Sequence, residues 1–134
     1  MADLTGLAPA TSEFDISRPT AADLSALQYT VVKHNTSEKV VACGANEKSL
    51  GILQNKPDGS TNEATAHVRT GGLSLLKIAE AVVQGNYLTC TAAGLGEVAD
   101  AANEEIVAKA LTSGDANDLI LVKITEGKDT DGNG

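Results

Sequence analysis

The stretch Leu50–Gly72, LGILQNKPDGSTNEATAHVRTGG, has the pattern of a β-hairpin. A short apolar segment leads into a turn rich in Asn, Asp, Gly and Ser, and a second segment ends on a basic residue followed by glycine. The stretch Ile106–Gly127, IVAKALTSGDANDLILVKITEG, repeats this order roughly 55 residues later. Two such hairpins favour a compact all-β body.

The size and the composition fit one domain with an unusual core. The chain has 134 residues, of which 42% are hydrophobic, but it contains one Phe, two Tyr and no Trp. The core must therefore be built from Val, Ile, Leu and Ala. A buried aromatic side chain removes about 150–250 Å² from water, so this scarcity indicates that partner chains supply part of the stability. We expect an oligomer.

The charge balance argues against two classes of partner. The formal net charge is -8, and the ten Lys and Arg residues form no cluster along the sequence, so direct binding to nucleic acid is not expected. No apolar run approaches the roughly 18 residues needed to span a bilayer, and the N-terminus lacks the pattern of a secretion signal. We expect no membrane partner and synthesis without secretion.

Two cysteines, Cys43 and Cys90, are far apart in the sequence and fit no C-x-x-C pattern. The simplest interpretation is a pair of reduced, buried small residues. A disulfide bond between them is the alternative.

The chain divides into an arm, a body and a tail. Residues 1–26 are rich in Ala, Thr, Ser, Asp and Pro, which predicts an extended N-terminal arm, with an unstructured terminus as the alternative. The segment FDI within this arm is the best candidate to dock in a groove or to add to a sheet edge on another subunit. The candidate contact residues are Phe14, Asp15, Ile16 and Arg18. Residues 126–134 are predicted to form a disordered acidic tail.

Residues 27–125 are predicted to form the body. Period-two alternation predicts a strand that begins at Leu27, and the segment Gly72–Lys77 reads as another strand, as does Asn86–Thr91. Ala79–Gln84 reads as a turn or a short helix. The expected fold class is all-β: a small β-barrel or β-sandwich of hairpins with at most one short helix, plus the extended N-terminal arm.

The motifs that could carry chemistry are incomplete. Asp129, Asp131, Asn133 and Gly134 match the opening of a calcium-binding loop, but the chain ends before the glutamate that would complete the ligand set. Ser74 and Lys77 form S-x-x-K without the other motifs of serine acylating enzymes.

The two histidines, His34 and His67, have no metal-ligand spacing around them, and no G-x-S-x-G sequence is present to hold a nucleophile. We expect no catalytic residues, no bound cofactor and no metal site.

The order of segments across the body resembles that of the capsid cement or head decoration proteins of tailed bacteriophages. The elements that carry the resemblance are GILQN (51–55), AHVRTG (66–71), VQGNYLT (83–89), TAAG (91–94), AKAL (108–111) and LILVKI (119–124). The resemblance rests on the order and spacing of these elements over about residues 27–125, and not on any single element. The long N-terminal arm is a further trait of that family, whereas the Asp-rich tail is not.

The resemblance implies a protein that assembles as a homotrimer on the major capsid protein, on the exterior of the expanded head of the virion, after synthesis in the host cytoplasm. Such a cement would be non-enzymatic and would stabilise the shell. The alternative is a non-enzymatic β-module that binds a small ligand or a glycan on the virion. Its weakness is the small number of aromatic side chains, Phe14, Tyr29 and Tyr87.

Overall fold

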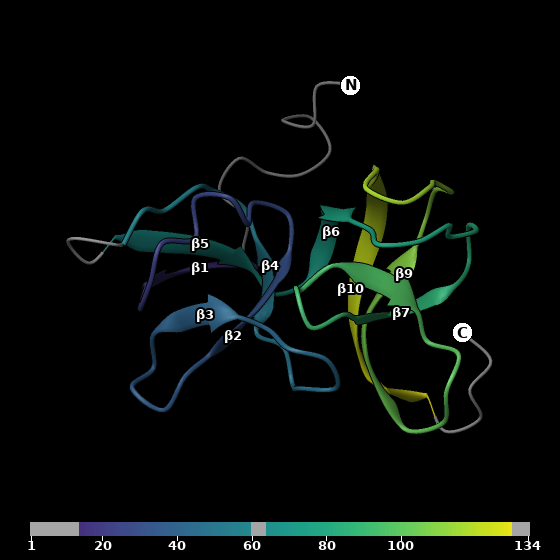
Figure 1. The fold of residues 1–134 in the computed structure, drawn as a ribbon, viewed down its shortest axis with the longest axis horizontal. Helices are drawn as coiled ribbons and strands as arrows, with labels where there is room; N and C mark the ends of the chain where they lie inside the picture. Colours follow the sequence, from purple (N-terminus) through teal and green to yellow (C-terminus); the bar gives the residue numbers. More distant parts are fainter. Residues whose placement is uncertain (1–13, 60–63, 130–134) are drawn as a thin grey trace.

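The computed structural model describes residues 14–59 and 64–129, which form two five-stranded antiparallel sheets lying side by side (Figure 1). The first sheet has the order β1-β5-β4-β2-β3, with β1 Asp15–Pro19, β2 Val31–His34, β3 Val40–Ala42, β4 Gly51–Leu53 and β5 Thr65–Arg69. The second has the order β6-β10-β9-β7-β8, with β6 Gly72–Lys77, β7 Tyr87–Cys90, β8 Gly96–Val98, β9 Glu104–Ala110 and β10 Leu119–Asp129.

The described ranges contain no helix, so the all-β prediction is confirmed, with two sheets in place of a closed barrel. Nor, within these ranges, is there any helix with the length and apolar character that a bilayer crossing requires.

The two sheets share one topology. Each is built from five consecutive strands in which the first lies beside the fifth and the fourth lies between the fifth and the second. Each also has one parallel and one antiparallel isolated bridge at corresponding places. These bridges join Thr20 to Val40 and Asp23 to Asp58 in the first sheet, and Ile78 to Gly96 and Val82 to Gly114 in the second. The chain therefore builds the same sheet twice.

The two hairpins anticipated from the sequence are corresponding parts of this repeat. In the first, β4 pairs with β5, and Leu53 lies opposite Val68. In the second, β9 pairs with β10, and Ile124 lies opposite Ala108. Both hairpin predictions are confirmed.

Aliphatic side chains from both sheets form one continuous core between them. Adjacent residues of a strand point to opposite faces, and in β2 both Val31 and Val32 are buried. Val31 packs with Leu76 of the second sheet, whereas Val32 packs in a smaller core of the first. Burial of each such side chain stabilises the fold by about 1.5–3 kcal/mol, so β2 ties the two sheets into one body.

Several strand boundaries differ from the sequence prediction in detail. The strand predicted from Leu27 begins at Val31, because Leu27 to Thr30 form a turn in which the backbone N–H of Thr30 and its hydroxyl both donate to the Leu27 carbonyl at 3.1 and 2.7 Å. Tyr29 has a φ of 65° in this turn. The strand Gly72–Lys77 has the predicted bounds. Residues 79–84 contain bends and an isolated bridge, so the turn alternative holds there.

The predicted arm differs from the structure within residues 14–26. Asp15–Pro19 forms the edge strand β1, which pairs with β5 of the same chain, and Leu24 is buried in the core of the first sheet. The composition of this segment did not indicate a strand or a core residue. The segment becomes a strand by pairing with β5, which comes about 50 residues later in the chain. Residues 1–13 of the predicted arm lie outside the described residues.

The predicted tail also starts too early. β10 continues to Asp129, and beyond a register shift it pairs Gly127 with Ile106 and Asp129 with Glu104. Backbone pairing along β9 holds this polar segment, which has no apolar side chain to signal a strand. Residues 130–134, with most of the partial calcium-loop motif, lie outside the described residues.

Candidate docking surface

The four residues proposed from the sequence as contacts lie on or next to β1. Asp15 forms an ion pair with Arg69 of β5, with Nε–Oδ1 and Nη2–Oδ2 distances of 2.8 and 3.1 Å. Ile16 packs against the core of the first sheet. Arg18 is exposed, and its guanidinium donates to the neighbouring Ser17 carbonyl at 3.2 Å. Asp15 and Ile16 are therefore engaged within their own chain.

Phe14 is 48% exposed and lies over the glycines that join the two sheets. Its carbonyl accepts hydrogen bonds from the N–H and the hydroxyl of Thr70, each at 2.7 Å. A Cβ atom on Gly71 or Gly72 would stand 2.9 or 3.0 Å from the ring, so the two glycines leave the space that the ring occupies. Phe14 is thus held at the junction with one side of its ring exposed.

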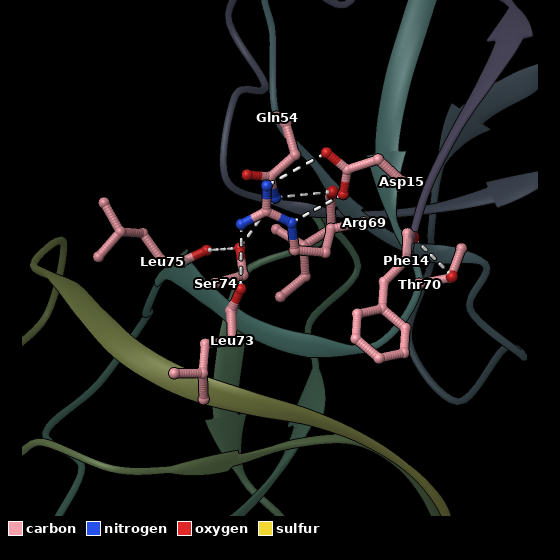
Figure 2. Close-up of polar contacts among 9 residues, drawn as sticks. Phe14, Asp15, Gln54, Arg69, Thr70, Leu73, Ser74 and Leu75 are labelled. Carbon is pink, nitrogen blue, oxygen red and sulfur yellow. Dashed lines mark hydrogen bonds and ion pairs between the residues drawn. The ribbon is translucent and has the colours of Figure 1, made fainter. Parts of the chain in front are cut away.

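Arg69 fixes the start of β6 relative to the first sheet (Figure 2). Besides binding Asp15, its guanidinium donates to the Leu73 carbonyl at 3.1 Å. Gln54 donates to the hydroxyl of Ser74 at 2.9 Å, and Ser74 donates to the Leu75 carbonyl at 2.9 Å. These bonds hold the first residues of β6 in one position.

The outer face of β6 and β10 carries leucines and lysines in a repeated order. The pattern Leu-x-Leu-x-Lys occurs in β6 and again in β10, and the antiparallel register places the two copies against each other. Directly opposed residues share one face of a sheet. The partners are Leu73 with Lys123, Leu75 with Leu121, and Lys77 with Leu119. The alternate residues of both strands point into the core, so this set points outward.

A third lysine extends this surface across the sheet. Lys109 of β9 lies opposite Lys123, and Tyr87 of β7 lies opposite Lys109. The Lys109 ammonium is 5.5 Å from the centroid of the Tyr87 ring, a cation–π contact. We call the set Leu73, Leu75, Lys77, Lys109, Leu119, Leu121 and Lys123 the leucine–lysine face.

Within the described residues, the leucine–lysine face is apolar, basic and partly exposed. Leu119 and Leu73 are 50% and 38% exposed. Among the described residues, no ion pair joins Lys77, Lys109 or Lys123 to a carboxylate. Large apolar side chains rimmed by charges are typical of protein contact surfaces. This face therefore has the composition of a docking surface for an acidic, partly apolar partner.

A groove adjoins the leucine–lysine face where the two sheets meet. It has a volume of roughly 400 Å³, and its lining includes Tyr29, Lys56, Lys77 and Leu119. The unusual backbone of Tyr29 places that residue at the groove, and its carbonyl accepts the N–H of Lys77 at 2.9 Å. The groove adds one further cationic side chain, Lys56, beside Lys77 and the apolar side chain of Leu119, which suits a carboxylate on an apolar stem.

Acidic side chains gather around β8, where Glu97 lies opposite Thr89 and so on the same face of the sheet as Tyr87 and Lys109. The pKa of Glu97 is raised above its ordinary value by burial and by the nearby charges of Glu80, Glu104 and Asp100. On the first sheet the pKa of Glu47 is lowered, because its carboxylate accepts hydrogen bonds from the Lys33 ammonium and the Gly44 N–H. The basic leucine–lysine face on β6, β10 and β9 is therefore bordered by an acidic group at the β8 edge of the same sheet.

The other motifs noted in the sequence are not assembled into reactive groups. Ser74 is buried and bound to Gln54, while Lys77 lies three residues along the same strand and so on its opposite face. His67 shares a hydrogen bond of 3.0 Å with the hydroxyl of Ser17. The described residues contain no group of three or more His, Cys, Asp or Glu side chains arranged to hold a metal ion.

The leucine–lysine face is a candidate docking surface that sequence reasoning missed. The signal was present as two Leu-x-Leu-x-Lys patterns, in LSLLK (73–77) and LILVK (119–123). In both, the intervening residues are also apolar or small, so the sequence reads as a strand buried on both faces. Only the register shows which residues remain uncovered.

No protein-family model matches the chain, and no curated protein matches it. The fold is similar to that of a solved structure, the N base of the head fibre protein gp8.5 of bacteriophage phi29. The TM-score is 0.70 at 12% sequence identity, and the match covers 85% of this chain and 97% of that one. The likeness establishes a shared fold.

Proposed function

We propose that this chain is a non-enzymatic structural protein of a tailed-phage head, which binds the outer surface of the expanded capsid as a homotrimer and stabilises it. The observation that carries the proposal is the fold shared, over nearly the whole of both chains, with the base of a phage head fibre. The segment order that resembles head decoration proteins points to the same class of protein.

The leucine–lysine face supplies the contact surface that this function needs. Its three lysines lie on a protein of net charge -8, so an acidic partner would be repelled by most of the molecule and attracted to this face. The interleaved leucines favour an apolar protein surface over nucleic acid. We therefore assign the partner as an acidic, partly apolar surface of the major capsid protein.

Trimeric assembly would strengthen a modest contact. Three linked copies bind a shell with far higher avidity than one copy, without any change in the single contact. The core contains no aromatic side chain, which is consistent with subunit contacts that add stability. The protein would be made in the host cytoplasm and be carried on the exterior of the virion.

The glycan-binding alternative gains no support from Tyr87. This ring is 44% exposed, but the Lys109 ammonium lies over it and occupies the place on which a sugar ring would stack.

The test is binding of the purified chain to expanded heads that lack it. We expect saturable binding, and decorated heads that survive heating better than bare heads. Lys123→Glu should weaken binding by about tenfold or more, because it places a carboxylate in the middle of the basic surface.

The matched control is Lys48→Glu, which changes the net charge equally at an exposed residue outside the leucine–lysine face. Absence of binding by the unaltered chain would contradict the function. Equal binding by both variants would contradict the assignment of the surface.

A further inference from the structure

The two cysteines come from different sheets and meet in the core between them. Cys43 follows β3 of the first sheet, and Cys90 is the last residue of β7 of the second. Both are reduced and buried, with exposed fractions of 0% and 1%, and both belong to the core that joins the sheets. Their position in the repeat makes them a point of contact between its two halves.

The two sulfur atoms contact the same backbone carbonyl oxygen. The thiol of Cys90 donates to the Gly44 carbonyl at 3.2 Å, and the thiol of Cys43 lies 3.5 Å from the same oxygen. The interaction between the two thiols lowers the pKa of Cys43 and raises that of Cys90. Two thiols that contact the same carbonyl oxygen from opposite sheets need only a small rearrangement to form a covalent bond.

We propose that Cys43 and Cys90 are a redox modification site, at which a low-molecular-weight disulfide converts the two thiols into a disulfide bond between the sheets. Cys43, as the thiolate, attacks one sulfur of the reagent and forms a mixed disulfide, with release of one small thiol. Cys90 then attacks the Cys43 sulfur and releases the second small thiol. The two protons from the cysteines end on the two released thiols, and the reagent is the oxidant.

The disulfide bond would stabilise the whole molecule because it closes a long loop of the chain. The chain between the two cysteines contains β4, β5 and β6, that is, the end of the first sheet and the start of the second. A cross-link across a long loop restricts the unfolded chain more than one across a short loop. The bond would also make the two sheets unfold together. A particle that leaves a reducing cytoplasm for an oxidising exterior would gain this bond without any change in its surface.

The turn that follows Cys43 is the surface segment next to the buried pair. The segment after Cys43 turns back at Gly44–Glu47, where the Glu47 carboxylate accepts the Gly44 N–H at 2.7 Å. The Lys33 ammonium pairs with the same carboxylate from β2. Local opening of this turn would expose Cys43, which fits the order of attack given above.

The experiment treats the intact chain with oxidised glutathione under native conditions and follows it by intact mass and by non-reducing peptide mapping. We expect a mass loss of about 2 Da, a Cys43–Cys90 peptide, and a rise in Tm of about 5–10 °C that a reductant reverses. Cys90→Ala should instead stop at the mixed disulfide and show no such rise in Tm.

Two results would overturn the proposal. One is a native protein that retains both free thiols while the same protein in denaturant is oxidised. The other is a bridged protein whose Tm is unchanged or lower. Because the peptide map is made on the unaltered chain, it decides the question even where Cys90→Ala fails to fold. The inference concerns the chain alone and does not depend on shell binding.

Discussion

At the scale of single residues, the ion pair between Asp15 and Arg69 holds a side chain that also reaches the start of the second sheet. The side chains of Arg69 and Asp15 are 15% and 24% exposed, so both charges are largely removed from water. Arg69 also donates to the Leu73 carbonyl, so one guanidinium contacts β1, β5 and the start of β6. Loss of the carboxylate would leave this cation partly buried without a counter-charge.

We expect Asp15→Ala to lower the free energy of unfolding by about 2 kcal/mol, between the values typical of exposed and of buried ion pairs. The measurement is denaturant unfolding followed by circular dichroism. Arg18→Ala is the matched control, because its guanidinium is exposed and bonds to its neighbour's carbonyl; a change within about 0.5 kcal/mol is expected there. Equal losses for the two variants would show that the ion pair is not a joining contact.

At the scale of elements, β8 and its flanking loops carry an acidic group whose charge opposes folding. The pKa of Glu97 in the folded chain is raised, so its contribution to stability is greatest below the ordinary value of 4.5 and is lost as the pH rises through its folded-state pKa. The contribution of Glu47 to stability changes with pH in the opposite direction. Its pKa is lowered, so its contribution is present above 4.5 and is lost as the pH falls through its folded-state pKa.

Glu97→Gln should therefore raise Tm at pH 7 and have little effect at pH 4, where the native carboxyl is largely neutral. Glu47→Gln should lower Tm at pH 7. Thermal unfolding of both variants at the two pH values checks the prediction. A Glu97→Gln variant that is less stable than the native chain at pH 7 would refute the assigned direction.

The sequence predicted the elements whose pattern is local. Gly72–Lys77 and the hairpins β4–β5 and β9–β10 combine alternation or β-branched residues with turn chemistry at short range. β1 and the end of β10 were missed because DISRP (15–19) and EGKD (126–129) carry few apolar residues, and backbone pairing with a distant strand makes them strands. Tertiary pairing overrides local propensity in both.

The candidate site was predictable only in part, for a similar reason. The residues Phe14 to Arg18 were chosen as an isolated apolar segment, and the structure shows Asp15 and Ile16 engaged within their own sheet. The lysines of the leucine–lysine face are 32 and 14 residues apart along the chain, from Lys77 to Lys109 and on to Lys123, so no cluster is visible in the sequence. The register of β6, β10 and β9 places these lysines on one face of the second sheet.

At the scale of the whole molecule, the chain is a repeat of one five-stranded sheet with distinct surfaces on its two halves. The halves share a core, the Arg69 contacts and the neighbouring thiols of Cys43 and Cys90. Only the second half carries the leucine–lysine face. A two-sheet body with a basic, partly exposed face among its described residues suits a subunit that attaches to a larger assembly in a fixed orientation.

The most direct test of the central claim is a single-particle reconstruction of expanded heads saturated with this protein. We predict threefold-related density on the outer surface, with β6 and β10 toward the shell and the leucine–lysine face against the capsid protein. Density that places β6 and β10 toward solvent would contradict the assigned surface. Heads without added density at saturating protein would contradict the proposed function itself.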